Sequence, residues 1–205
     1  MEIKNKSGGK TASGTEYHRR ILDAAARLME RNGIDSVNMY QIAQEAGIGQ
    51  GTLYRRYEHP GEIYSELLRT SMEQFVDRLE AQLELDGDSS AAILGRLRDA
   101  IERAVDYIDD HVDLLDSINC MYAGKKSSML DKRPVMIRLR TLVTSYLDLA
   151  VERGETREID VTLTTSFLLA ALGPGQYMYH RDTMGYTKER YLAEVVRLFI
   201  DGSRK

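Results

Sequence analysis

Apolar residues recur at helical spacing along most of the chain, and this periodicity constrains the fold more than any other feature. Ile21, Ala25 and Leu28 belong to the first stripe, and residues three or four apart lie on one face of a helix. Similar stripes follow over residues 63–83, 93–108, 135–150 and 191–199. Only three prolines and no tryptophan occur among 205 residues, which argues against a loop-rich or all-β chain. The sequence therefore predicts an all-α protein with nine helices.

Capping residues mark the ends of several predicted helices. Asn38 is a good N-cap for a short second helix, which Gly47 would close in the left-handed conformation. A third helix is expected over about residues 51–57. Pro60 then suits the first position of a long fourth helix, where a missing N–H costs nothing.

The opening of the chain differs in composition from the rest. Its Gly- and Lys-rich residues predict a disordered basic arm over residues 1–15, with ordered structure beginning near Glu16. The whole chain has a net charge of −4, yet residues 1–65 carry nine Lys and Arg against eight Asp and Glu. Positive charge is therefore concentrated in residues 1–20, which include Arg19 and Arg20, and again at Arg55 and Arg56, as a surface that contacts phosphates requires.

Cysteine content and hydropathy indicate the compartment. The single cysteine, Cys120, excludes an internal disulfide and a zinc site with several cysteine ligands. No apolar run suits a signal peptide or reaches the roughly 18 residues of a membrane span. We therefore expect a cytoplasmic protein without a membrane partner.

Residues 38–53 fit a helix-turn-helix, in which two short helices cross closely. Ala43 is small enough for the crossing point, and Gly47 lies four residues later, where the turn needs a left-handed residue. Apolar residues at the remaining positions lock the angle, namely Ile42, Ala46, Ile48 and Leu53. A nucleotide-binding glycine loop is the alternative for the stretch GIGQGT, but it needs a preceding strand and a glycine where Thr52 stands.

The segment from Arg20 to Leu68, with its sequence IAQEAGIGQGTLYRRYEHP, resembles the N-terminal DNA-binding segment of the TetR family of transcriptional repressors. The resemblance implies an all-α homodimer with an N-terminal three-helix helix-turn-helix DNA-binding domain over residues 16–62. A six-helix ligand-binding and dimerisation domain would follow over residues 63–205. Dimerisation would use the last two helices, about 160–180 and 187–200. The implied partners are double-stranded operator DNA and an unknown small-molecule effector, and no cofactor is implied.

The family's DNA contacts fall on and around the short third helix. Carried over by position, they are Asn38, Tyr40, Gln50, Gly51, Thr52, Tyr54, Arg55, Arg56 and His59. The residue types suit this role, since Arg can bind the O6 and N7 edge of guanine, Gln can bind adenine, and Thr or Tyr can bond phosphate.

Two residues depart from the family pattern. Pro60 stands where a phosphate-binding lysine is usual, and Gly49 stands where a serine commonly caps the third helix. We hypothesise that the Lys-bearing arm offsets both losses by entering the adjacent minor groove.

The C-terminal domain offers candidate ligand contacts of largely aromatic and apolar character. They are Tyr107, Ile118, Met121, Tyr122, Tyr146, Phe167, Gln176 and Tyr177. A cavity with such a lining would suit a flat apolar or aromatic molecule. Pro174, between two glycines, is expected to kink or end the eighth helix.

The leading hypothesis is a repressor that a small, largely apolar or aromatic ligand releases from DNA. A DNA-bound scaffold that recruits a protein partner, without a small-molecule ligand, is the alternative. An enzyme ranks last, because the sequence contains no nucleophile motif, metal-ligand spacing or phosphate loop. His111 lies among acidic residues, but a helix junction explains this cluster better than a metal site. We therefore assign no catalytic or metal-binding residue.

Overall fold

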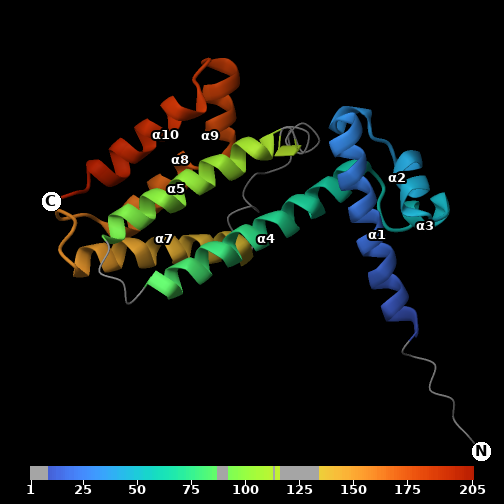
Figure 1. Ribbon diagram of the computed structural model, residues 1–205, viewed down its shortest axis with the longest axis horizontal. Helices are drawn as coiled ribbons and strands as arrows, with labels where there is room; N and C mark the ends of the chain where they lie inside the picture. The colour runs from blue at the N-terminus through green and yellow to red at the C-terminus, as the bar shows by residue number, and fades with distance from the viewer. Residues whose placement is uncertain (1–8, 87–91, 113, 116–133) are drawn as a thin grey trace, which may run out of the picture. The chain divides into compact units, whose positions relative to one another are not determined.

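The computed structural model describes residues 9–86, 92–112, 114–115 and 134–205, and the regular elements among them are helices (Figure 1). The single pairing of β type in this part of the chain is an isolated bridge between Thr156 and Arg204. None of the described helices is both long and apolar enough to cross a membrane. The expectation of an all-helical chain is therefore confirmed, while the predicted sixth helix, expected after the junction at residues 109–113, lies largely outside the described residues.

The described residues form two compact units, which divide within the fourth helix after Ser71. The first unit contains α1 (Gly9–Asn32), a short 3-10 turn (Ile34–Ser36), α2 (Met39–Ala46), α3 (Gln50–Tyr54) and the start of α4 (Pro60–Asp86). Its core consists of fully or nearly fully buried apolar side chains from all four helices, among them Ile21, Ala24, Ala25, Leu28, Ile42, Ala43, Ala46, Leu53 and Ile63. The apolar positions predicted for the helix-turn-helix thus form one core.

The first helix begins earlier than the sequence indicates. α1 begins at Gly9, about two turns before the expected start at Glu16, so residues 9–15 of the predicted arm are helical. Helix formation is cooperative: once the buried stripe fixes the downstream turns, each further residue adds a backbone hydrogen bond at little cost.

The second unit holds the remaining helices: α5 (Ile93–Asp110), α7 (Pro134–Glu152), α8 (Val161–Ala171), α9 (Pro174–Met178) and α10 (Lys188–Val196), with π-helical turns at Tyr179–Thr183 and Arg197–Asp201. Buried residues of α5 and α7 form the centre of its core, including Leu97, Ile101, Val105, Tyr146 and Leu147. Pro174 occupies the first turn of α9 directly after α8 ends, as predicted.

Glu155 joins three distant parts of the second unit. Its carboxylate accepts hydrogen bonds from the backbone N–H groups of Ile93 (2.8 Å) and Leu94 (3.0 Å), and so caps the N-terminus of α5. Its backbone carbonyl accepts a bond from the N–H of Lys205. Because the first N–H groups of a helix have no partner within the helix, a buried end needs such a cap.

We expect Glu155→Ala to lower the free energy of unfolding by about 1–2 kcal/mol, as the loss of a helix cap does. Chemical denaturation followed by circular dichroism measures this change. Glu158→Ala is the matched control, since it removes the same charge from an exposed position in the same loop. Equal stability of the two variants would show that the cap contributes nothing.

Candidate nucleic-acid interface

The turn between α2 and α3 has the conformation that its residue types favour. Asn38 caps α2 through a reciprocal pair: the N–H of Gln41 donates to the Asn38 side chain, and the N–H of Asn38 donates to the Gln41 side chain, both at 3.0 Å. Gly47 ends α2 with φ 60° and ψ 42°, in the left-handed region. The N-cap and the turn glycine predicted from the sequence are both confirmed.

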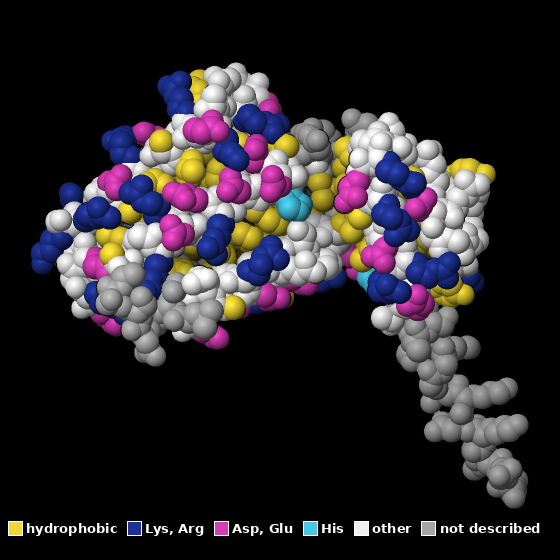
Figure 2. All heavy atoms as spheres, in the orientation of Figure 1, with side chains coloured by type: hydrophobic (Ala, Val, Ile, Leu, Met, Phe, Trp, Pro, Cys, Tyr) yellow, Lys and Arg dark blue, Asp and Glu magenta, His cyan; other side chains and the backbone are white. Residues whose placement is uncertain are grey.

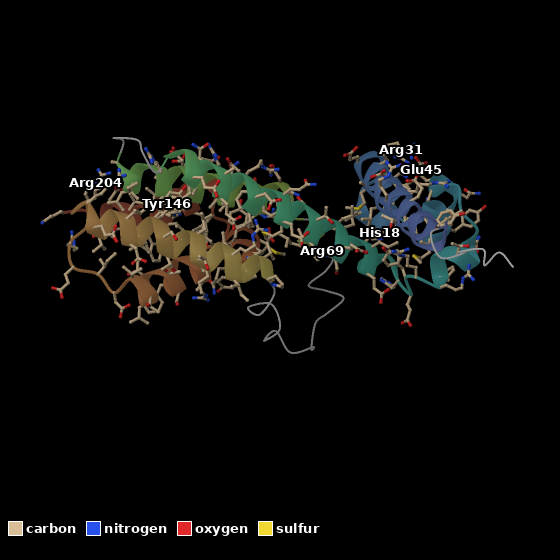
Figure 3. All side chains as sticks on the ribbon, turned by 90° about the horizontal axis from the view of Figure 1, so that it is seen from below. His18, Arg31, Glu45, Arg69, Tyr146 and Arg204 are labelled. Atoms are coloured by element: carbon tan, nitrogen blue, oxygen red, sulfur yellow. The ribbon has the colours of Figure 1, made fainter. Side chains whose placement is uncertain are left out.

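Arginines of α1 hold α2 in place from two sides. The guanidinium of Arg20 donates to the carbonyls of Ala46 (2.5 Å) and Gly47 (3.0 Å) at the end of α2. Arg31 and Arg27 pair with Glu45 at 2.7 and 3.0 Å (Figure 3). These bonds hold the pKa of the Glu45 carboxyl below its ordinary value. The ion pairs with Glu45 therefore contribute fully to stability when the pH is above the ordinary pKa of a glutamate. This contribution is lost as the pH falls through the lowered pKa of Glu45.

Most basic side chains of the first unit are engaged with acids or carbonyls. Figure 2 shows Lys and Arg interspersed with Asp and Glu over its visible face. Arg19, for example, pairs with Glu16 at 3.0 Å and with Asp23 at 3.5 Å. The positive charge predicted around residues 19 and 20 therefore serves the fold of the unit.

α3 presents nearly all of its residues outward. Leu53 is its only buried residue, whereas Gln50, Gly51 and Tyr54 are exposed, with Tyr54 at 52%. Thr52 is half-buried and accepts a long hydrogen bond of 3.4 Å from the exposed Arg55. The helix is shorter than expected, because it ends at Tyr54 and Arg55 is its C-cap.

Arg56 and Tyr57 follow the helix and belong to a different environment from Arg55. The Tyr57 hydroxyl donates to Glu66 at 2.6 Å and lies 2.9 Å from Nδ1 of His18. His18 also faces Glu66 at 3.3 Å. Burial and the contact with Glu66 raise the pKa of Tyr57, while Arg56 interacts with the same hydroxyl and acts in the opposite direction. The network ties the end of α3 to α1 and α4.

The remaining candidate contacts lie at the edges of this surface. Tyr40 is 52% exposed on α2, and its hydroxyl accepts a bond from Gln44 at 2.6 Å. His59 is exposed, and its Nδ1 accepts the N–H of Gly61 at 3.1 Å. Asn38 and His59 thus act as helix caps in this structure, so their side chains have a structural task besides any contact with DNA.

The candidate ligand residues lie in contrasting environments. Tyr107 is buried and stacks between Phe75 at 4.7 Å and His111 at 4.1 Å. Tyr177 is buried, and its hydroxyl donates to Asp109 at 2.5 Å. Burial and this bond raise the pKa of Tyr177.

Other candidates are exposed or lie outside the described residues. Phe167 is 61% exposed on α8, and Gln176 is exposed at the start of α9. Their side chains therefore do not line an enclosed pocket in the single chain. Ile118, Met121 and Tyr122 fall outside the described residues.

A small cavity of the second unit contains one predicted ligand residue, the buried Tyr146. Its other lining residues come from α4 and α5 and are mostly polar: Leu79, Gln82, Arg96, Asp99, Ala100 and Arg103. The cavity volume is about 50 Å³. Pockets for drug-sized ligands have volumes of about 300–1,000 Å³, so this cavity is too small for one.

Comparison with known proteins supports the architecture. Residues 21–59 match the model of bacterial regulatory proteins of the TetR family. An HTH-type transcriptional regulator of Staphylococcus aureus strain MRSA252 is 23% identical over 186 residues, which cover 91% of this chain and 94% of the relative.

Solved structures share the fold at low sequence identity. FadR of Bacillus subtilis, in complex with stearoyl-CoA, has a TM-score of 0.64 and 19% identity, with coverage of 90% of this chain and 98% of FadR. RolR in complex with resorcinol has a TM-score of 0.59 and 19% identity, with coverage of 92% and 90%.

The all-helical fold and the helix-turn-helix, together with these matches, define a DNA-binding transcriptional regulator. Residues 21–59 are thus a DNA-binding segment of the TetR type. The resemblance noted from the sequence is therefore confirmed.

Two tyrosines three positions apart allow the structural role to be tested separately from the expected binding role. We expect Tyr57→Phe to lower the free energy of unfolding by about 1 kcal/mol, because Glu66 and His18 lose a hydrogen-bond partner. Tyr54→Phe removes an exposed hydroxyl and should leave stability unchanged while weakening DNA binding. Thermal unfolding measures the first effect and fluorescence anisotropy with operator DNA the second. A loss of stability in Tyr54→Phe would contradict this division.

Proposed function

We propose that α3 is the recognition helix of a homodimeric repressor and that it enters the major groove of operator DNA. The observation that carries the proposal is the exposure of Gln50 and Tyr54 on a helix held by one buried leucine, with Arg55 exposed at its C-cap. Arg55 and Gln50 have the side chains that discriminate guanine and adenine in that groove. The two chains of a dimer would read half-sites about 34–36 Å apart.

Residues 16–62 would form the DNA-binding domain and residues 63–205 the ligand-binding and dimerisation domain. Thr52, Tyr40 and the backbone at Gly51 suit phosphate contacts beside the recognition helix. Asn38, Arg56 and His59 lie at its edges, and their present contacts restrict them to supporting roles. The basic arm before Gly9 would supply charge in the minor groove. We place the protein in the cytoplasm, where a regulator of this kind meets its operator.

Dimerisation through α8 and α10 accounts for the exposed apolar side chains of these helices. Leu163 (51% exposed) and Phe167 (61% exposed) are one turn apart on α8, and Leu198 (54% exposed) follows α10. Single exposed apolar residues are common, but such a group on the segments expected to pair favours an interface between two copies. Phe167 is thus better assigned to the interface than to the ligand pocket.

The second unit would bind a largely apolar or aromatic effector. The support is the aromatic character of Tyr107, Tyr146 and Tyr177 and the ligands of two structural neighbours, stearoyl-CoA in FadR and resorcinol in RolR. Because the cavity beside Tyr146 is small, binding requires the helices around it to separate. A ligand that prefers this opened state would shift the population away from the DNA-binding state.

Selection of bound DNA from a random pool tests this function. The dimeric protein should enrich a two-fold symmetric sequence, and stearoyl-CoA or resorcinol should release it if either resembles the effector. Enrichment with no release by these or by a wider set of apolar and aromatic compounds would favour a DNA-bound scaffold for a protein partner. Failure to enrich any sequence would exclude operator recognition.

We expect Arg55→Ala to weaken operator binding by about 1–3 kcal/mol and to relax the base preference at one position in each half-site, as the loss of a bidentate base contact does. Anisotropy titrations with operator variants measure both effects. Arg78→Ala, which removes the same charge from an exposed position of α4, is the control and should bind normally. Unchanged base preference in Arg55→Ala would remove this residue from the recognition set.

We expect Phe167→Asp to raise the dissociation constant of the dimer by about 100-fold or more, because each copy loses a buried aromatic ring and gains a charge. Sedimentation velocity at several concentrations measures the change. Ile137→Asp is the matched control, since Ile137 is an equally exposed apolar residue (55%) on α7. If only the control dissociates, the interface lies on α7 instead.

A further inference from the structure

Arg20 connects α1 to the turn of the helix-turn-helix, 26 and 27 positions further along the chain. One terminal nitrogen of its guanidinium donates to the carbonyls of both Ala46 and Gly47. A Cβ atom built on Gly47 would lie 2.7 Å from that nitrogen. The turn glycine is therefore required for its positive φ and also for the space that the guanidinium occupies.

The carbonyls at this place need a donor. The last carbonyls of a helix have no partner within it, and the C-terminus carries partial negative charge, so a cation there is favourable. The central carbon of the guanidinium also lies over the ring of Tyr17, 5.8 Å from its centroid. Arg20 thus interacts with an aromatic ring as well as with two carbonyls.

The start of α3 lacks a comparable support of its own. Its N-cap is Gly49, which makes no side-chain hydrogen bond. α3 has only five residues, and a helix so short depends on its surroundings for its direction. The conformation of residues 46–49 therefore sets how α3 is presented, and Arg20 is the charged side chain bonded to this turn.

We propose that Arg20 is a positioning residue for operator recognition: it fixes the turn that orients α3 and does not itself contact a phosphate. This inference rests on the proposed recognition of operator DNA by α3. The proposal gives two neighbouring arginines different roles. Arg20 bonds to the turn, whereas Arg19 is 65% exposed and pairs with Glu16 and Asp23 on the surface of α1.

The salt dependence of binding distinguishes positioning from phosphate contact. A lost phosphate contact lowers the slope of log K against log salt by about 0.9 and weakens binding to every DNA sequence. For Arg20→Gln we expect operator binding to weaken about tenfold, as the loss of a charged hydrogen bond does. The salt slope and the affinity for random DNA should not change. Arg19→Gln, the control with the same charge loss, should bind the operator normally.

Restoring the turn by another route gives a second, independent readout. Gly49 has φ −68° and ψ 141°, which suits a serine N-cap, and a Cβ there would lie no closer than 4.0 Å to its nearest neighbour, Thr52 Oγ1. Gly49→Ser should therefore recover most of the affinity lost in Arg20→Gln and change the wild-type affinity little. Equal effects of Gly49→Ser in both backgrounds would contradict a shared action on the turn.

Circular dichroism establishes that each variant is folded at the assay temperature. If Arg20→Gln does not fold, Arg20→Lys takes its place: a lysine keeps the charge that a phosphate needs, but its side chain is one bond shorter and lacks the planar guanidinium that bonds both carbonyls. For Arg20→Lys the proposal expects weaker operator binding with an unchanged salt slope. Wild-type affinity in this variant overturns the proposal. Wild-type protein that binds no selected DNA refutes the proposed function itself, whereas normal operator binding by Arg20→Gln refutes only the role of Arg20.

Discussion

The helix-turn-helix depends on the packing of two very short helices against α1. α2 has eight residues and α3 has five, and isolated helices shorter than about 12–15 residues are marginal in water. Their buried residues, Ile42, Ala43, Ala46 and Leu53, stabilise them only in contact with the apolar stripe of α1. Exposed ion pairs contribute little to stability by themselves. The polar contacts to Glu45 and to the end of α2 therefore orient α2 on α1, while burial supplies most of the stability.

Local chemistry explains which parts of this arrangement could be predicted from the sequence. Asn38 and Gly47 have residue types with strong preferences for one helix end, and Pro174 cannot continue a helix, so each marks a boundary that tertiary packing does not move. The same holds for Asp160, whose side chain accepts the N–H of Leu163 at the start of α8. The all-helical class followed from the apolar periodicity in the same direct way.

Contacts between distant residues explain what the sequence did not predict. Glu155 caps a helix that begins 62 positions earlier, and nothing in the spacing around it indicates this. The positive charge at Arg20 was interpreted as part of a basic surface, whereas its partners are carbonyls of another helix. Phe167 was assigned to a pocket because of its residue type, but burial depends on the neighbours that the fold provides. Composition and periodicity contain no information about such pairs.

The single buried residue of α3 has a consequence for the evolution of this regulator. Leu53 anchors the helix in the core of the first unit, whereas the side chains of Gln50 and Tyr54 are exposed. If α3 reads the operator as proposed, substitutions at Gln50 or Tyr54 alter the preferred DNA sequence at little cost in folding. Under that proposal, a duplicated copy of the protein can acquire a new operator by a few surface changes in the first unit, while the second unit is inherited unaltered.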